Sequence, residues 1–243
     1  MKKSLGSLAA VAILSSLAGA IGVTAATYDT NGVINFTPDT SITLPIDPTD
    51  PDPEVPVSPI DPTDPEGPNP GTAGPLSIDF ASSYAFGEQV ISTLNKVYYA
   101  DIQEFTDGGT GPNYVQVTDK RGTLEGWKLS VKQNGQFTTA DDELLTGAQI
   151  TLRKGAVTSN LASDATLIPG EVQSAVALKT TGEETVLVDA AVNQGAGTWI
   201  YRLGNNAEEG KTGVELSVPG STVKRAKEYR TTMTWVLSST PEN

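Results

Sequence analysis

A strict alternation of side chains near the end of the chain constrains its fold more than any other feature. In the run Tyr229–Leu237, every second residue falls on one face, which carries Tyr229, Met233, Trp235 and Leu237. The opposite face carries Arg230 and two threonines. A period of two is typical of a β-strand with one buried face. The run therefore predicts a strand that is half in a core.

The run Gly126–Val131 repeats this arrangement about a hundred residues earlier. Trp127 and Leu129 share one face with Val131, and Lys128 lies on the other. Both runs contain Trp-x-Leu, and the chain has only three tryptophans. We take these two runs as the pair of strands around which the domain is organised.

Further short runs of β-branched and apolar residues lie between Gly, Asn and Asp residues, as expected of strands joined by turns. The predicted strands are Leu76–Phe80, Gln89–Thr93, Val97–Tyr99, Tyr114–Thr118, Gly126–Gln133, Ala148–Arg153, Val172–Ala177, Glu184–Val188, Thr198–Leu203, Val214–Val218 and Tyr229–Leu237. This spacing predicts an all-β fold of short, mostly antiparallel strands with long loops. We expect a β-sandwich, with a barrel-like closure as the alternative.

Two turns carry specific expectations. Asn134-Gly135 is a strong hairpin signal and predicts that Gly126–Gln133 pairs with Gln136–Thr139. Asp189 is a suitable N-cap and predicts one helical turn over Asp189–Asn193.

An acidic, proline-rich segment precedes the domain. Its sequence Pro45–Pro51 recurs letter for letter as Pro59–Pro65. Proline favours extended geometry, so we expect a semi-rigid spacer, which would reach on the order of 80 Å if fully extended. Ten acidic residues and no Lys or Arg lie in the range 27–80, and their repulsion favours extension. Calcium binding is the alternative, but prolines interrupt the acidic pairs.

The beginning of the chain resembles a secretory signal peptide. Two lysines precede an uncharged run of small and aliphatic residues that ends in Ala25-Ala26. An uncleaved membrane anchor is the alternative, since the run is nearly long enough to span. The expected organisation is a signal peptide over 1–26, a segment with a short strand over 27–44, the spacer over 45–74 and the β domain over 75–243. No second apolar span or C-terminal sorting motif follows, so the mature form is expected to lack a membrane span.

Composition excludes several classes of function. Cysteine and histidine are absent, which removes disulfides, thiolate chemistry and the usual general base of nucleophilic triads. The formal charge of −13 argues against nucleic acid as a partner, because that contact needs basic patches. We expect no cofactor and no metal.

Together, several landmarks of the domain closely resemble the WxL-domain surface proteins of low-GC Gram-positive bacteria. These landmarks are Leu76–Phe80, Phe86-Gly87, Val117–Gly122, Gly126–Leu129, Gly147–Leu152, Gly197–Trp199 and Thr234–Leu237. The resemblance covers the chain from about Gly74 to its end, and the spacer also looks like that of the family's small members.

The resemblance implies an exported protein that attaches non-covalently to the cell wall, with peptidoglycan or an associated wall polymer as the ligand. It assigns binding to Trp127 with Leu129 and to Trp235 with Leu237. Lys128, Tyr229 and Arg230 are the neighbouring residues expected to support the site. The family also implies partners, namely other WxL proteins and membrane-anchored WxL-interacting proteins.

Each of these assignments has a plainer alternative. Tryptophan and leucine on one strand face are good core residues, whereas an exposed indole stacks on the C–H face of a sugar. Trp199 is expected in the core. The acidic run Asp141–Glu143 is either a cation site or a polar loop. Four basic residues precede or begin the last strand and either meet anionic wall polymers or protect a sheet edge; they are Lys224, Arg225, Lys227 and Arg230.

Three functions follow from these observations. The first is a wall-binding module that displays its spacer. The second is a structural subunit or adhesin of a surface complex, whose isolated strand Val33–Phe36 docks on a partner sheet by strand addition. The third, a carbohydrate-active enzyme with two carboxylates, lacks a nominated pair, and we expect no catalysis.

Overall fold

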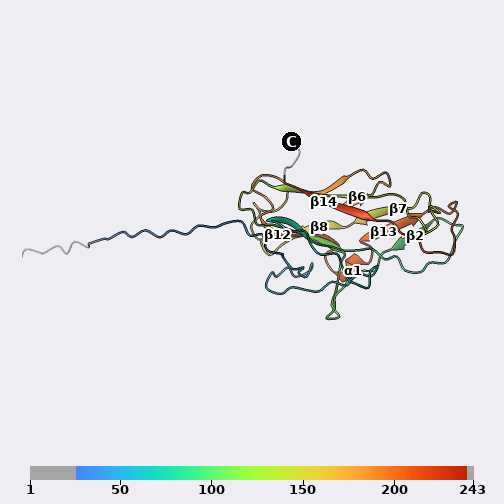
Figure 1. Ribbon diagram of the computed structural model, residues 1–243, viewed down its shortest axis with the longest axis horizontal. Coiled ribbons are helices and arrows are strands. Elements are labelled where there is room, and N and C mark those ends of the chain that lie inside the picture. Colours follow the sequence, from blue (N-terminus) through green and yellow to red (C-terminus); the bar gives the residue numbers. More distant parts are fainter. Residues whose placement is uncertain (1–25, 240–243) are drawn as a thin grey trace, which may run out of the picture. The chain divides into compact units, whose positions relative to one another are not determined.

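The computed structural model describes residues 26–239 in two parts, which are treated separately (Figure 1). The first part ends at Phe36, and the second is a compact unit that begins at Thr37. Residues 26–36 form no strand, and Val33, Ile34 and Phe36 are exposed. The short strand expected in this segment is therefore absent from the described chain, because a strand needs a hydrogen-bonded neighbour.

The predicted signal peptide and the alternative membrane anchor fall almost entirely on residues 1–25, which lie outside the described residues. Within residues 26–239, no helix is both long enough and apolar enough to cross a membrane.

Three four-stranded antiparallel sheets make up most of the compact unit. The β5 sheet has the order β1 (Leu76–Ala81), β5 (Tyr114–Asp119), β12 (Gly197–Leu203) and β8 (Gly155–Thr158). The β7 sheet has the order β10 (Ala175–Ala177), β7 (Gln149–Arg153), β13 (Val214–Val218) and β2 (Lys96–Tyr99). The β6 sheet has the order β14 (Met233–Ser238), β6 (Trp127–Gln133), β11 (Thr185–Ala190) and β9 (Glu171–Val172). A small ribbon of β3 (Gln103–Glu104) and β4 (Thr110–Gly111), and one turn of helix, α1 (Ala207–Gly210), complete the described elements.

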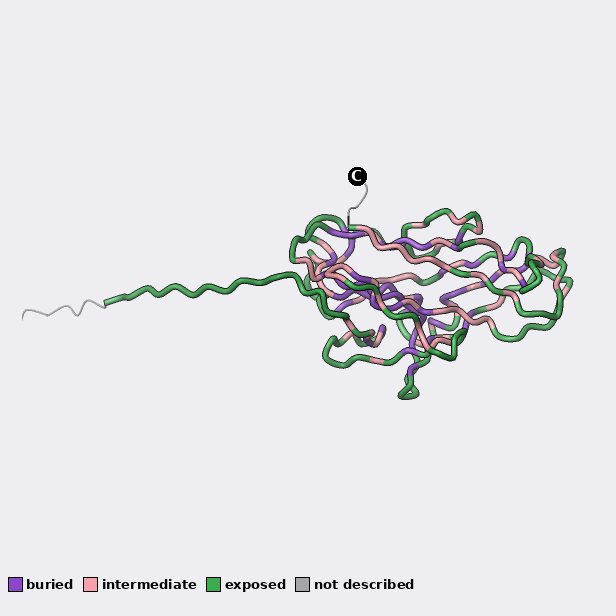
Figure 2. The backbone as a smooth tube through the Cα atoms, in the orientation of Figure 1, coloured by how far each residue is buried: buried purple, intermediate pink, exposed green. Residues whose placement is uncertain are grey.

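The three sheets share one hydrophobic core, which Figure 2 shows as buried backbone in the middle of the compact unit. Alternate residues of the strands supply it, including Trp199, Tyr201 and Leu203 of β12, Ile150 and Leu152 of β7, and Val214 and Leu216 of β13. The expected core position of Trp199 is confirmed. The predicted all-β, sandwich-like fold is also confirmed, and within residues 26–239 no sheet closes into a barrel.

Strand β5 is buried along its whole length, on both faces. Val115 and Val117 face the shared core. Tyr114, Gln116 and Thr118 face the other way and are nevertheless at most 2% exposed. Alternation in a strand places successive side chains on opposite faces, so a second layer must cover the outer face of this sheet.

The proline-rich segment supplies that cover. Ile46 is buried in a second apolar cluster, whose other buried members are Phe80, Phe105, Tyr114 and Ile200. The backbone N–H of Ile46 donates to Oε1 of Gln116 at 2.9 Å, and Nη1 of Arg202 donates to the carbonyl oxygen of Pro48 at 2.8 Å. These contacts hold the segment on the outer face.

The expectation of a spacer that stands away from the domain therefore differs from the structure. The segment is irregular, as its prolines require, but it bends back instead of extending. Asp47 and Asp61 each accept hydrogen bonds from the backbone N–H and the hydroxyl of the threonine two residues later, which forms a tight turn in each repeat. Those turns and the apolar side chain of Ile46 outweigh the mutual repulsion of the acidic residues.

The two turn expectations were wrong. The N–H of Asn134 donates to the carbonyl of Thr232, so the edge of β6 is taken by β14 and no regular strand forms over 136–139. Asp189 lies inside β11, opposite Lys128, and does not cap a helix. Pairing with distant strands overrides both local signals. The predicted strand over 89–93 is also absent, and Val90 there is 89% exposed.

The turn that leads into β6 yields a test of this packing. Gly126 has φ +79°, and an added Cβ would overlap the backbone oxygens of Ala190 and Ala191. Gly122 has a similar φ of +72° but open space around it. We expect Gly122→Ala to lower the free energy of unfolding by about 1–2 kcal/mol through backbone strain alone. Gly126→Ala should cost clearly more, as measured by urea unfolding. Equal losses would contradict the close approach of β6 and the end of β11.

Candidate functional site

The first Trp-x-Leu motif lies inside the molecule. Trp127 and Leu129, on β6, are each 1% exposed. The indole N–H of Trp127 donates to the carbonyl oxygen of Gly195 at 2.8 Å, so its polar edge is satisfied within the protein. Stacking on a sugar needs an exposed ring face. In this structure the first motif therefore supports the sheet from within.

The second motif lies beside the first, on the same face of the same sheet. Strand β14 pairs with β6 so that Trp235 is opposite Val131 and Leu237 is opposite Leu129. Both Trp235 and Leu237 pack against the core, yet they are only half-buried, because β14 is an edge strand. The structure thus brings the two motifs together but leaves only the second with exposed surface.

The supporting residues are divided between two places. Lys128 lies on the opposite face of β6 from Trp127 and forms an ion pair with Asp189 of β11 at 3.2 Å. The hydroxyl of Tyr229 accepts a hydrogen bond from the backbone N–H of Arg225 at 2.9 Å. Arg230 is exposed and paired with Glu228. Only Tyr229 and Arg230 lie on the segment that leads into β14.

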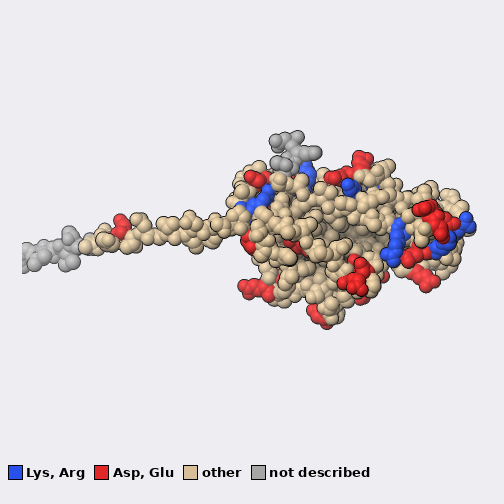
Figure 3. All heavy atoms as spheres, viewed as in Figure 1, with Lys and Arg blue, Asp and Glu red and all other residues tan. Residues whose placement is uncertain are grey.

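Acidic and basic runs that are distant in the sequence meet at the surface. Nζ of Lys227 contacts Asp141 at 2.6 Å and Glu143 at 2.9 Å, and Arg225 contacts Glu143 at 3.1 Å. We call these four residues the ion-pair cluster; Figure 3 shows how acidic and basic side chains adjoin on the surface. The hydrogen bonds that Lys227 donates to Asp141 and Glu143 raise the pKa of Lys227, and the one to Glu143 lowers the pKa of that carboxyl group.

From the sequence alone, the acidic run Asp141–Glu143 could bind a cation and the basic run before β14 could bind an anionic wall polymer. Each run is the other's partner in this structure. Within residues 26–239, moreover, no group of three or more His, Cys, Asp or Glu side chains is arranged to hold a metal ion.

An open groove lies beside the ion-pair cluster. We call it the Gln136 groove; its volume is about 430 Å³, and it is lined by Gln136, Leu144, Thr146, Gly147, Ala148, Gln149 and Thr180. The hydroxyl of Thr222 donates to the carbonyl of Thr146 at 2.6 Å, and the backbones of Thr138 and Arg230 pair. The groove is therefore joined to the segment that enters β14. No sequence signal indicates it, because Thr180 comes from a separate part of the chain.

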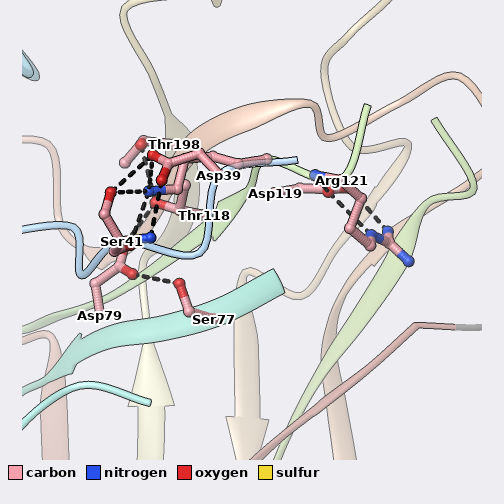
Figure 4. Close-up of polar contacts among 9 residues, drawn as sticks. Asp39, Ser41, Ser77, Asp79, Thr118, Asp119, Arg121 and Thr198 are labelled. Carbon is pink, nitrogen blue, oxygen red and sulfur yellow. Dashed lines mark hydrogen bonds and ion pairs between the residues drawn. The ribbon is translucent and has the colours of Figure 1, made fainter. Parts of the chain in front are cut away.

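A buried carboxylate lies beneath the proline-rich segment (Figure 4). A bulge in β1 between Ile78 and Phe80 directs Asp79 towards the outer face of the β5 sheet. Asp79 accepts hydrogen bonds from the hydroxyl of Ser77 at 2.7 Å, the amide of Gln116 at 2.9 Å and the hydroxyl of Thr118 at 2.5 Å. Burial raises the pKa of Asp79 above its ordinary value of 3.8, although the three hydrogen bonds act in the opposite direction.

Two ion pairs form at the end of β5, next to the Thr118 that binds this carboxylate. Nζ of Lys120 binds Asp39 at 2.7 Å and the carbonyl of Ser41 at 2.8 Å, which fastens the start of the proline-rich segment. Arg121 pairs with Asp119 at 2.8 Å. Every carboxylate shown in Figure 4 is thus engaged within the protein, and the arrangement is structural in character.

The raised pKa of Asp79 has a consequence for stability. The folded chain holds this proton more tightly than the unfolded chain, so the contribution of Asp79 is fully present below the unfolded pKa, near 3.8, and is lost as the pH rises through the folded pKa. Asp79→Asn keeps an acceptor for Gln116 and Thr118 and removes the buried charge. We expect the variant to be at least as stable as the wild type at about pH 7, and to lose that advantage towards about pH 4.

Urea unfolding at both pH values measures this difference. Asp79→Ala serves as the comparison, because it leaves three donors without an acceptor and should cost about 1–3 kcal/mol. If the wild type gains no stability relative to Asp79→Asn between about pH 7 and about pH 4, the raised pKa of Asp79 is contradicted.

Comparisons with known proteins show to which family the chain belongs. The chain matches the profile of the WxL domain, described as surface cell wall-binding, over residues 23–241. The match includes the proline-rich segment that the structure places on the β5 sheet. Neither the curated proteins nor the solved structures contain a significant match. The family description locates such a domain at the cell wall. With nearly the whole chain covered, the protein belongs to the WxL family of surface proteins and carries its cell wall-binding domain.

Proposed function

We propose that the domain attaches the protein non-covalently to the wall by binding peptidoglycan, and that the contact surface consists of the Gln136 groove and the half-buried second motif. The observation that carries the proposal is the pairing of β14 with β6, which leaves Trp235 and Leu237 partly exposed at a sheet edge. The segment that enters this edge is joined to the groove by Thr222, whose hydroxyl donates to the carbonyl of Thr146.

The chemistry of the groove suits a glycan with acetamido groups. Its walls offer the amide of Gln149 and the hydroxyls of Thr146 and Thr180, beside the exposed apolar side chain of Leu144. Amides and hydroxyls exchange hydrogen bonds with acetamido and hydroxyl groups, and an apolar or aromatic surface covers the C–H face of a sugar ring. The net charge of the ion-pair cluster is zero, so it favours a neutral glycan over a strongly anionic polymer.

In this proposal the first motif acts indirectly. Trp127 and Leu129 anchor β6 in the core, and β14 pairs with β6, so they fix the position of Trp235 without touching the ligand. We also propose that the protein binds without turning its ligand over. Release of soluble fragments from purified peptidoglycan by the pure protein would overturn this part.

Co-sedimentation of the chain from Ala26 onward with walls stripped of teichoic acids tests the proposal. Gln149 is exposed, and among residues 26–239 its side chain has no hydrogen-bond partner. We expect Gln149→Ala to weaken binding about fivefold, which corresponds to one lost hydrogen bond. Trp235→Ala should weaken it further, because it removes the stacking surface.

Gln173→Ala is the matched control, because Gln173 is equally exposed and lies outside the groove. Circular dichroism establishes that each variant is folded. Unchanged binding by folded Gln149→Ala and folded Trp235→Ala would place the ligand elsewhere, and absence of wild-type binding would reject peptidoglycan.

A second function, that of a structural subunit in a surface complex, is favoured by one edge of the β7 sheet. Strand β2 forms this edge, with Val97 50% exposed and Tyr99 44% exposed. Val90, Ile91 and Leu94, in the loop before it, are exposed as well. An exposed apolar edge offers unpaired backbone groups to a strand from another protein. We propose that β2 receives a strand of a membrane-anchored WxL-interacting protein.

Gel filtration with the extracellular part of such a partner tests the second function. Val97→Lys puts charge on the edge, and we expect it to abolish co-elution while leaving wall binding unchanged. Val192→Lys is the matched control, because Val192 is 64% exposed in a loop away from β2. Co-elution of the Val97→Lys variant would exclude β2 as the docking edge.

A further inference from the structure

The two identical heptapeptides of the proline-rich segment adopt the same local turn in different surroundings. In Pro45–Pro51, Oδ1 of Asp47 accepts from the N–H and the hydroxyl of Thr49, both at 2.7 Å. In Pro59–Pro65, Oδ1 of Asp61 accepts from the same two groups of Thr63, again at 2.7 Å each. The local shape is therefore a property of the seven residues and not of the surface beneath them.

The surroundings differ in what happens to the isoleucine. Ile46 is 2% exposed, among the side chains of Phe80, Tyr114 and Ile200. Ile60, at the corresponding position of the second repeat, is 40% exposed. The second repeat is held elsewhere: the N–H of Ile60 donates to the carbonyl of Glu104 at 2.9 Å, its carbonyl accepts from Gln103 at 2.8 Å, and Oδ2 of Asp61 accepts from the hydroxyl of Ser83 at 2.6 Å.

The hydrogen bonds from the outer face of the β5 sheet to the first repeat reach only groups that both repeats offer. Gln116 binds the N–H of Ile46 and the carbonyl of the residue before Pro45, and Arg202 binds the carbonyl of Pro48. Each of these is a backbone group, and the only buried side chains of the first repeat are those of Ile46 and Pro48. The sheet therefore contacts nothing in Pro45–Pro51 that Pro59–Pro65 lacks.

We propose that this face is a docking site for the Pro-Ile-Asp-Pro motif, and that the second repeat, Pro59–Pro65, occupies it when the first leaves. The exchange moves the chain by 14 positions, since Ile60 replaces Ile46. Residues 66–71 must then connect the docked repeat to Thr72, whose N–H is bonded to the carbonyl of Ile78 on β1. Six residues span up to about 20 Å, and Phe80 of the site lies only two residues beyond Ile78 on the same strand.

An intramolecular motif has an advantage over one from another molecule, because its tether keeps its local concentration high. The exchange leaves the core of the domain unchanged and lengthens the free N-terminal part by 14 residues. The repeat that occupies the site thus determines the length of chain between the domain and whatever the N-terminal segment contacts.

Disulfide trapping tests the exchange cleanly, because the chain has no cysteine. A Cβ at Gly111 lies 3.1 Å from Cγ of Pro48, so Gly111→Cys with Pro48→Cys reports the first repeat in the site. Gly111→Cys with Pro62→Cys reports the second. With native Ile46, we expect the first pair to form a disulfide in most molecules and the second pair in fewer than about a tenth.

Replacement of Ile46 by serine should reverse this ratio. In Ile46→Ser, the second pair becomes the major disulfide, and Ile60→Ser in the same chain abolishes it. Val55→Ser is the matched control, since Val55 is 61% exposed in the same segment, and it should leave the first pair dominant. Folding is checked by circular dichroism. If Ile46→Ser does not fold, the milder Ile46→Val should shift the ratio in the same direction.

Two results would overturn the proposal. One is a folded Ile46→Ser or Ile46→Val chain in which the disulfide between positions 111 and 62 does not increase. The other is a disulfide between two chains, seen as a dimer on non-reducing electrophoresis, which would show that the site takes a repeat from a second copy instead.

Discussion

The burial of β5 on both faces is the constraint on which the rest of the compact unit depends. Val115 and Val117 hold the β5 sheet on the shared core, while Gln116 holds the proline-rich segment on the opposite side. A glutamine at this position satisfies a backbone donor and a backbone acceptor of a segment that has no strand of its own. The first repeat therefore joins the domain as a layer that does not pair with the strands of the β5 sheet.

Much of the fold follows from local patterning. The alternation in Gly126–Gln133, Thr198–Leu203 and Val214–Val218 predicts β6, β12 and β13 with their buried faces, because a period of two fixes which side chains point inward. The failure of the expected hairpin at Asn134 was not predictable in the same way. Its turn signal is local, whereas the pairing of β6 with β14 joins residues about a hundred positions apart. A local sequence pattern does not reveal how strongly such a long-range strand pairing stabilises the fold.

The candidate site was predictable only in part. The shared tryptophan spacing indicated that the two motifs belong together, and they do lie on one face of one sheet. Their different exposure depends on strand order, since β6 is internal and β14 is an edge. The Gln136 groove combines residues of 136–149 with Thr180, and the ion-pair cluster joins 141–143 to 225–227. Each arises from the folded arrangement of loops, which no single stretch of sequence encodes.

Two of the three tryptophans are buried and the third lies at the surface, and this difference gives the protein an intrinsic fluorescence reporter. Trp127 and Trp199 are each 1% exposed, and each indole N–H is bonded to a carbonyl oxygen. Trp235 alone keeps part of its ring in contact with solvent. An aqueous quencher of fluorescence consequently reaches the second motif and spares the other two rings. Changes in the red edge of the emission spectrum therefore report on the surface of β14, without any added label.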